Sequence, residues 1–258
     1  MQILIFDMDG VLLEPQGYHR ALQETVRLVS QSLGFEEFHL PDEDIARFEA
    51  LGISSEFSSS ALCMALMLIE ACKQGFQPEF STTVKPETAD PRKLALDLDG
   101  LFALIVAQSM QTPALTRSMV AIEGCAMQAQ VDVNMVSGVV RECESLEQSL
   151  TFNVFQELVL GSEVFENTYG KSPQFGQESY LNQYDRSYIS PELMGKLRNW
   201  FNRPEHGAAI MTNRPSSQLL GFPGTPEAEL GAALVGLEFL PILGYGEITW
   251  LADQKDVA

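Results

Sequence analysis

The feature that most constrains the fold is a short apolar run that breaks abruptly into acidic residues near the start of the chain. Ile3-Leu4-Ile5-Phe6 is followed directly by Asp7-Met8-Asp9-Gly10. A continuous apolar run that ends in a turn is typical of a strand buried on both faces of a parallel sheet. The sequence therefore predicts a central parallel strand with two carboxylates at its carboxyl end, and Gly10 is expected to provide the tight turn that follows.

A second strand of the same kind is predicted near the other end of the chain. Ala208-Ala209-Ile210-Met211 is apolar and runs into Thr212-Asn213-Arg214-Pro215. Upstream, Ser190-Pro191-Glu192 combines a capping hydroxyl, a proline at the first helical position and an acid in the first turn. This combination predicts a helix start. The two ends of the chain are therefore expected to form one α/β core.

The long segment between these ends is predicted to be mostly helical. Apolar periodicity and capping residues predict helices over residues 18–33, 44–50, 58–73, 91–108 and 113–128, with several more between 133 and 169. Proline, glycine and polar residues predict loops over 75–90 and 170–187. We expect an α/β core made of residues 1–14 and 188–258, and a helical domain made of residues 15–187.

The charge balance limits the possible partners. The 258 residues include 16 Lys+Arg and 35 Asp+Glu, which gives a formal net charge of −19. This acidity argues against binding to nucleic acid or to an anionic membrane, because both would repel the chain. With 45% hydrophobic and 20% charged residues, the composition is that of a globular protein. The sequence leaves the oligomeric state open.

No segment of the sequence has the character of a membrane span or a secretory signal. The longest apolar run, from Ala61 to Ile69, is far shorter than the about 20 residues that a membrane helix needs. The N-terminus has no basic region and already carries an acid at Asp7, so a secretory signal is not expected. The four cysteines contain no CxxC pair, which favours reduced thiols and a cytoplasmic location.

Asp7 and Asp9 are the first candidates for catalytic residues. Two carboxylates at one strand tip repel each other, and a hard cation such as Mg²⁺ or a shared proton relieves the repulsion. One carboxylate could attack phosphorus while the other handles the proton of the leaving group. A solvent-facing acidic turn is the alternative interpretation of this pattern.

The surrounding residues favour the catalytic interpretation. The segment ILIFDMDGVLLEP resembles the first motif of the haloacid dehalogenase superfamily, and AAIMTNRP resembles its second motif. The resemblance implies a Rossmann-like, doubly wound parallel sheet, with a helical cap that closes over the active site and selects the substrate. It implies that Asp7 is the nucleophile and becomes an aspartyl phosphate. It also implies that Asp9 acts as acid and base, and that both residues hold Mg²⁺, Asp9 through its backbone carbonyl.

The second motif supplies the remaining candidate residues. By the same resemblance, Thr212 hydrogen-bonds the phosphoryl oxygens, and Gly10, Asn213 and Arg214 are expected to contribute to substrate binding. Members of the superfamily that cleave carbon–halogen bonds or phosphonates lack the second Asp, so Asp9 favours chemistry on phosphate esters. We therefore expect a Mg²⁺-dependent hydrolase of a small phosphorylated metabolite. The alternatives are a phosphomutase that uses the same intermediate and a catalytically inactive binding protein.

A second Asp-x-Asp-Gly sequence, at residues 97–100, is not expected to be catalytic. Residues 91–96 contain no apolar strand, and Asp90-Pro91 predicts the start of a helix that continues through the motif. Asp97 and Asp99 are therefore expected on the surface of that helix.

The third and fourth motifs of the superfamily, a lysine and an acidic pair, have no clear match. Asp253, Lys255 and Asp256 resemble them faintly. The separation between Thr212 and Asp253 leaves little room for the strand and helix that normally carry the lysine. We therefore expect the core to be truncated at its C-terminus, with these motifs beyond residue 258. Such a chain is expected to be an incomplete catalyst in which the first strand lies at a sheet edge.

Overall fold

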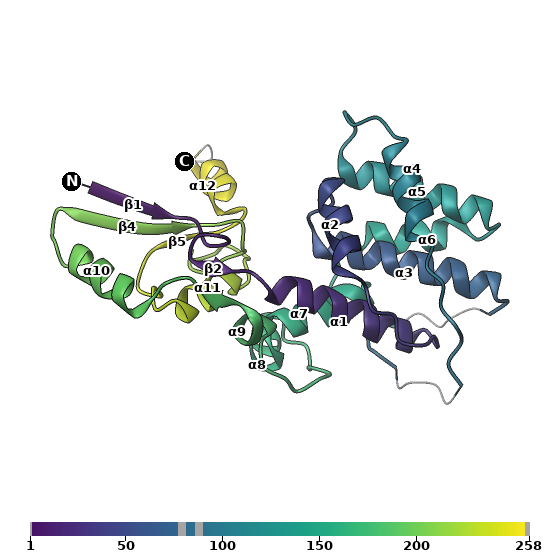
Figure 1. The fold of residues 1–258 in the computed structure, drawn as a ribbon, viewed down its shortest axis with the longest axis horizontal. Helices are drawn as coiled ribbons and strands as arrows, with labels where there is room; N and C mark the ends of the chain where they lie inside the picture. The colour runs from purple at the N-terminus through teal and green to yellow at the C-terminus, as the bar shows by residue number, and fades with distance from the viewer. Residues whose placement is uncertain (1, 77–80, 86–89, 256–258) are drawn as a thin grey trace. The chain divides into compact units, whose positions relative to one another are not determined.

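The computed structural model of the chain describes residues 2–76, 81–85 and 90–255 and divides into two compact units (Figure 1). The core unit comprises Met1–Tyr18 and Val159–Ala258, and the helical unit comprises His19–Leu158. The second boundary therefore falls near residue 159, whereas the sequence suggested residue 188. Its position is explained by contacts of the 159–187 segment within the core unit. For example, the Asp185 carboxylate accepts hydrogen bonds from the backbone N–H groups of Gln16 and Gly17, at 2.8 and 2.7 Å.

The core unit contains a small parallel sheet. Its strands are β1 (Gln2–Phe6), β4 (His206–Met211) and β5 (Ile242–Leu243), in the spatial order β1-β4-β5 (Figure 1). Phe6 pairs with Ile210, and Met211 pairs with Leu243. Both predicted strands are therefore confirmed, and they are direct neighbours. A small parallel sheet combined with many helices also confirms the α/β class.

Two positions were expected for the first strand, central in a complete core and at an edge in a truncated one, and the described residues show the edge position. Among them, β1 pairs only with β4, so it lies at an edge of the sheet. Ile3 and Ile5 are 58% and 66% exposed on one face of β1, whereas Phe6 packs against the core from the other. The buried cluster of the core unit packs on the face that carries Phe6, which leaves Ile3 and Ile5 exposed on the other.

The other elements of the core unit are short. They are the helices α8 (Ser162–Tyr169), α9 (Tyr180–Tyr184), α10 (Pro191–Phe201), α11 (Glu227–Leu234) and α12 (Glu247–Lys255), and an antiparallel pair of strands, β2 (Leu13–Glu14) and β3 (Arg186–Ser187). The predicted start of α10 is confirmed, because the Ser190 hydroxyl accepts a hydrogen bond from the backbone N–H of Leu193 at 3.2 Å. The predicted loop over 170–187 contains α9 and β3, which its polar composition did not indicate.

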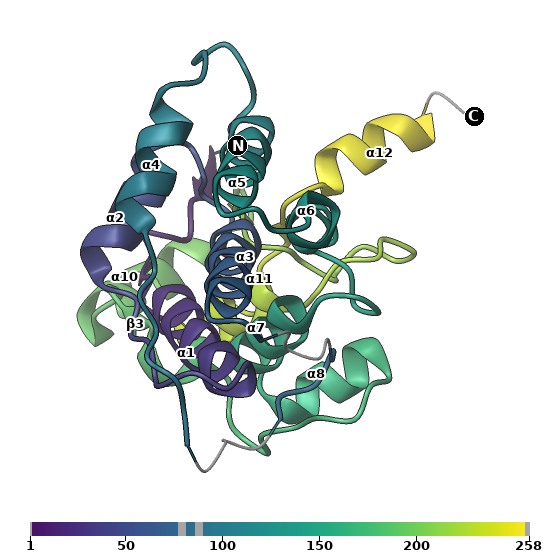
Figure 2. The ribbon, with the colours of Figure 1, turned by 90° about the vertical axis from the view of Figure 1, so that its right-hand side faces the viewer.

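The helical unit is built around α3 (Glu56–Lys73). Residues 58–69 of this helix are all buried, as expected for a helix surrounded by protein on every side. It contacts α5 (Ala114–Gln128) and α6 (Val133–Arg141), and α4 (Leu98–Val106) contacts α5 (Figure 2). The helix α2 (Asp42–Ala50) contacts α4. Two further helices, α1 (Gly17–Ser32) and α7 (Leu150–Leu160), continue across the boundaries between the units.

Part of the predicted loop over 75–90 lies outside the described residues, which omit 77–80 and 86–89. In the described part of the chain, no helix combines the length and the apolar character that crossing a membrane requires.

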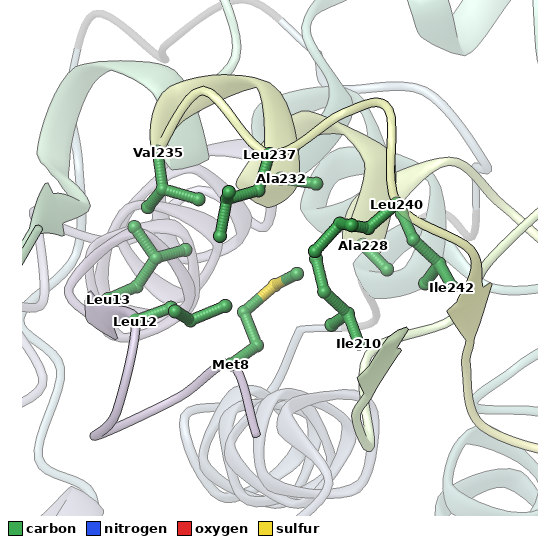
Figure 3. Packing of buried hydrophobic residues seen from close by; sticks show 10 residues of the cluster. All are labelled: Met8, Leu12, Leu13, Ile210, Ala228, Ala232, Val235, Leu237, Leu240 and Ile242. Carbon is green, nitrogen blue, oxygen red and sulfur yellow. The ribbon is translucent and has the colours of Figure 1, made fainter. Parts of the chain in front are cut away.

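A buried apolar cluster anchors the turn that follows β1. Figure 3 shows its residues, which come from this turn, β4, β5 and α11 and the segment after it: Met8, Leu12, Leu13, Ile210, Ala228, Ala232, Val235, Leu237, Leu240 and Ile242. Met8 is fully buried in the cluster, although it stands between two acidic residues. Asp7 is exposed and Asp9 is partly exposed, so burying Met8 leaves both carboxylates outside the apolar cluster.

This anchor depends on a glycine in α11, and we expect Gly231→Ala to destabilise the core unit. A Cβ atom at Gly231 would lie 2.5 Å from Sδ of Met8 and 3.1 Å from Cδ1 of Leu13. Overpacking of this kind typically costs about 1–3 kcal/mol in the free energy of unfolding, which urea denaturation would measure. The matched control is Gly195→Ala in α10, where no atom lies within 4 Å. There alanine should increase stability by up to about 1 kcal/mol. Equal effects of the two substitutions would contradict the packing argument.

Candidate functional site

Asp7 and Thr212 lie at the carboxyl ends of two neighbouring strands. They follow β1 and β4, which are parallel neighbours, and the pairing of Phe6 with Ile210 places Asp7 level with Met211. Asp7 is exposed, and its Oδ1 accepts a hydrogen bond from the Met8 N–H at 2.7 Å. Thr212 is buried, and its hydroxyl oxygen accepts a hydrogen bond from the backbone N–H of Arg214 at 3.2 Å. The fold therefore brings together two predicted site residues that are far apart in the sequence.

Asp9 and Arg214 form an ion pair that joins the two loops. Nε of Arg214 lies 3.0 Å from Oδ1 and 3.1 Å from Oδ2 of Asp9, and Nη2 lies 2.5 Å from Oδ1. Nη2 also donates to Oδ2 of Asp185 at 2.8 Å. The Arg214 side chain is 1% exposed and the Asp185 side chain is fully buried, whereas Asp9 is 33% exposed. Arg214 therefore lies inside the protein, where it fixes the orientation of the Asp9 carboxylate.

The charge of Arg214 is stabilised by its neighbours. Burial disfavours the charged guanidinium, but the hydrogen bonds to Asp9, together with the Asp185 carboxylate nearby, raise the pKa of Arg214 above its ordinary value. Arg214 therefore stays protonated and keeps both oxygens of Asp9 engaged.

A second polar pair lies close to this network. The Tyr18 hydroxyl donates a hydrogen bond to Oε2 of Glu227, and the Arg214 guanidinium lies 5.1 Å from the centre of the Tyr18 ring. Burial raises the pKa of Tyr18 well above its usual value, and the Glu227 carboxylate raises it further. Tyr18 therefore remains neutral in the physiological pH range and acts as a hydrogen-bond donor.

The other predicted substrate-binding residues lie at the ends of the two strands. Gly10 is exposed and has a φ of +77°, as expected for the tight turn, and its N–H donates to the carbonyl of Leu13 at 2.8 Å. Asn213 is exposed beside Thr212.

Sequence reasoning missed Asp185 and Glu227, both of which the fold buries near the candidate site. Asp185 lay in a segment interpreted as a loop, and an isolated acid in a polar stretch gives no sign of burial. Glu227 is one of two acids in the first turn of α11, a position where acidic residues are common and usually exposed. The cap of that helix is Pro226, and the Thr225 hydroxyl bonds the Glu227 carboxylate at 3.1 Å.

The second Asp-x-Asp-Gly sequence begins a helix of the helical unit. Asp97 is the N-cap of α4 and accepts a hydrogen bond from the Gly100 N–H at 2.8 Å. Asp99, whose side chain is 87% exposed, forms an ion pair with Arg47 at 2.8 Å. The surface position is therefore confirmed, whereas the predicted helix start at Asp90-Pro91 is wrong. Before α4, the backbone of Arg92 instead exchanges hydrogen bonds with the 34–36 segment.

We therefore expect Asp97→Asn/Asp99→Asn to leave phosphate-ester hydrolysis by the full-length protein within a few-fold of the wild-type rate. Asparagine is also a good N-cap, so helix α4 should persist. Asp97→Ala should instead cost about 1 kcal/mol in unfolding free energy, because it removes the cap. Steady-state rates and urea denaturation measure the two effects. A loss of activity in Asp97→Asn/Asp99→Asn would show that this motif takes part in the chemistry.

Of the residues considered for the third and fourth motifs, Asp253 lines a pocket that is also lined by Thr212 and Asn213. Asp253 is exposed on α12. Lys255 ends the same helix, and Asp256 lies outside the described residues. Within residues 2–76, 81–85 and 90–255, no three His, Cys, Asp or Glu side chains are grouped closely enough to hold a metal ion. Mg²⁺ is often bound by one or two carboxylates together with substrate phosphate and water, so the exposed Asp7 carboxylate offers the minimum set of ligands.

All four cysteines belong to the helical unit, whereas Asp7 and Thr212 belong to the core unit. All four are free thiols, as expected, and Cys63 and Cys143 are buried. Burial raises the pKa of Cys63 to about 12, so this thiol stays protonated and unreactive.

A pocket of about 520 Å³ opens beside Thr212. One side is formed by the end of β4, with Thr212 and Asn213, and the other by α12, with Ile248 and Trp250. The turn after β5, which includes Tyr245, completes its wall.

Comparisons with known proteins bear on the fold. No protein-family model and no curated protein matches this chain. Two solved structures do. The X-ray structure of a Northeast Structural Genomics Consortium target is 16% identical, with a TM-score of 0.66 over 98% of this chain and 72% of that chain. A phosphatase from Thermococcus thioreducens is also 16% identical, with a TM-score of 0.45 over 95% of this chain and 72% of its own. The first likeness shows that this chain shares its fold with a larger protein.

Proposed function

We propose that the protein is a Mg²⁺-dependent hydrolase of small phosphate monoesters that acts through an aspartyl phosphate on Asp7. The observation that carries the proposal is the placement of Asp7 and Thr212 at the ends of two neighbouring parallel strands. Asp7 is an exposed carboxylate, and Thr212 provides a hydroxyl next to it along the sheet edge. Loops at the carboxyl ends of parallel strands are the usual place for active sites in α/β proteins. The resemblance of both segments to motifs of the haloacid dehalogenase superfamily supports the same assignment.

The proposed reaction has two steps. Oδ2 of Asp7 attacks phosphorus, because Oδ1 already accepts a hydrogen bond from Met8. As this bond forms, the bond between phosphorus and the leaving oxygen breaks, and that oxygen takes a proton from Asp9. Water then attacks phosphorus and transfers a proton to Asp9, which releases inorganic phosphate and restores Asp7. Asp9 therefore has to start the cycle protonated, so on substrate binding it takes up a proton from solvent and exchanges one of its hydrogen bonds with Arg214 for one with the leaving oxygen.

Thr212 and Asp7 have further roles in this proposal. The Thr212 hydroxyl oxygen accepts a hydrogen bond from the backbone N–H of Arg214, so the hydroxyl proton is free to be donated to a phosphoryl oxygen. Mg²⁺ would be held by the Asp7 carboxylate and the backbone carbonyl of Asp9, and when bound it offsets the negative charge of the phosphate. Without the metal, an anionic phosphate ester would approach a chain with a net charge of −19, which is unfavourable. This is a physical reason to expect a strict requirement for the metal.

The test is to trap the intermediate. The full-length protein is mixed with a phosphate monoester labelled at phosphorus, in Mg²⁺ or in excess chelator, and quenched in acid. We expect protein-bound label only with Mg²⁺, and we expect neutral hydroxylamine to release it, because hydroxylamine cleaves acyl phosphates. Turnover without any bound label, or label that resists hydroxylamine, would contradict the aspartyl-phosphate mechanism.

One observation favours a second candidate, a catalytically inactive binding protein. In the described residues Asp9 is fully engaged by Arg214, and no three-residue metal cluster accompanies Asp7. Binding of phosphate esters to the full-length protein without any hydrolysis, with or without Mg²⁺, would support this alternative.

A further inference from the structure

The pocket beside Thr212 borders the proposed phosphate site, and Asp7 is not among its lining residues. Thr212 and Asn213 belong both to the second motif and to the pocket wall, so the two spaces share a border. The volume of about 520 Å³ lies within the range of small-molecule sites, about 300–1,000 Å³. A phosphate ester bound at Thr212 therefore has room for its leaving group in the pocket.

The floor of the pocket is held by backbone contacts between the loops after β4 and β5. The Thr212 N–H donates to the Leu243 carbonyl at 3.0 Å, and the Tyr245 N–H donates to the Arg214 carbonyl at 3.0 Å. Gly244 allows this close approach, because a Cβ atom there would lie 2.6 Å from the Arg214 carbonyl oxygen. The buried Glu247 carboxylate accepts a hydrogen bond from the Gly244 N–H. The pocket wall is therefore ordered before any ligand binds, which lowers the entropic cost of binding.

The side chains of the pocket favour a flat apolar group. Tyr245 is 69% exposed, and Trp250 is held by an edge-on contact with Phe222, with ring centres 5.8 Å apart. Ile248 and Met211 add exposed apolar surface. Aromatic side chains bind other rings through stacked or edge-on contacts.

The charge of the pocket disfavours a second anionic group on the ligand. Its described lining residues include Asp253 but no lysine, arginine or histidine. A bisphosphate would therefore place its second phosphate near a carboxylate without a compensating cation, which is unfavourable.

We infer that this pocket binds the leaving group of the substrate, and that the preferred substrates are phosphate monoesters of uncharged aromatic alcohols. The inference rests on the proposed function for the placement of the phosphate. Tyr245 and Trp250 are its specificity-determining residues, and the lack of cations excludes bisphosphates.

The test uses phosphonates, in which a P–C bond replaces the P–O bond that would be hydrolysed. Calorimetry measures the dissociation constants of benzylphosphonate, propylphosphonate and propane-1,3-bisphosphonate for the full-length protein with Mg²⁺. We expect benzylphosphonate to bind about ten-fold more tightly than propylphosphonate, and the bisphosphonate to gain nothing over propylphosphonate. Tyr245→Ala should reduce the preference for benzylphosphonate to within about three-fold. The control Tyr188→Ala, at a tyrosine that is 53% exposed and outside the pocket, should leave it unchanged.

Equal affinity for the benzyl and propyl ligands, or a preference that survives Tyr245→Ala, would overturn the inference. So would tighter binding of the bisphosphonate. Failure of the proposed function has a different signature, because the preference for benzylphosphonate would persist while no phosphate ester is hydrolysed. Turnover of 2-naphthyl phosphate and glycerol 2-phosphate, measured in parallel, separates the two results.

Discussion

The Asp7→Asn variant of the full-length protein is expected to lose Mg²⁺-dependent hydrolysis of phosphate esters. The amide cannot attack phosphorus, so no aspartyl phosphate forms, and kcat should fall by at least about 10³-fold. Because Asp7 is exposed and its neighbour Met8 supplies the buried anchor, the substitution should leave the fold intact. Steady-state kinetics, together with the amount of acid-trapped label, measures the loss.

The chain offers a control with the same local sequence. Asp97→Asn makes the same chemical change at the first Asp of the other Asp-x-Asp-Gly sequence, where the residue caps α4. This variant should retain the wild-type rate within a few-fold. If Asp7→Asn keeps more than about a tenth of the activity, Asp7 is not the nucleophile.

The sequence predicted the elements that carry the site but not their surroundings. Local patterns identified β1, β4 and the start of α10, because an apolar run with a polar end and a Ser-Pro-Glu cap are properties of adjacent residues. β5 was missed, since a two-residue strand has no periodicity to detect. The edge position of β1 was expected only because the third and fourth motifs had no clear match, and not from the residues of the strand itself. An apolar strand carries no information about how many neighbours it has.

The same distinction applies to the site. The motifs predicted Asp7, Asp9 and Thr212 as site residues from the residues immediately around each of them, and these assignments stay predictions. The contact between Arg214 and Asp185 could not be predicted in this way. The two residues are far apart in the sequence, and the segments around them share no pattern. Arg214 was expected to contact substrate, and the structure shows that its guanidinium contacts two carboxylates inside the protein.

This buried network leads to the largest expected effect on stability. Arg214→Met replaces the guanidinium with an apolar side chain that still fills much of its space. It leaves Asp185, whose side chain is fully buried, without its cation. A buried ion pair often adds little net stability, because desolvation opposes the attraction, but removing one partner strands the other charge. We therefore expect Arg214→Met to lower the free energy of unfolding by about 3–5 kcal/mol, measured by urea denaturation.

A double-mutant cycle separates the stranded charge from lost packing. Asp185→Asn removes the charge of Asp185 but keeps an amide oxygen to accept the N–H groups of Gln16 and Gly17, which begin α1. In Arg214→Met/Asp185→Asn no charge is stranded at position 185. The decrease in the free energy of unfolding should therefore be smaller, by about 1–3 kcal/mol, than the sum of the decreases in the two single variants. Arg203→Met, at an exposed arginine, should change stability by less than about 0.5 kcal/mol. Strict additivity would mean that Arg214 and Asp185 are not energetically coupled, which would contradict the stranded-charge argument.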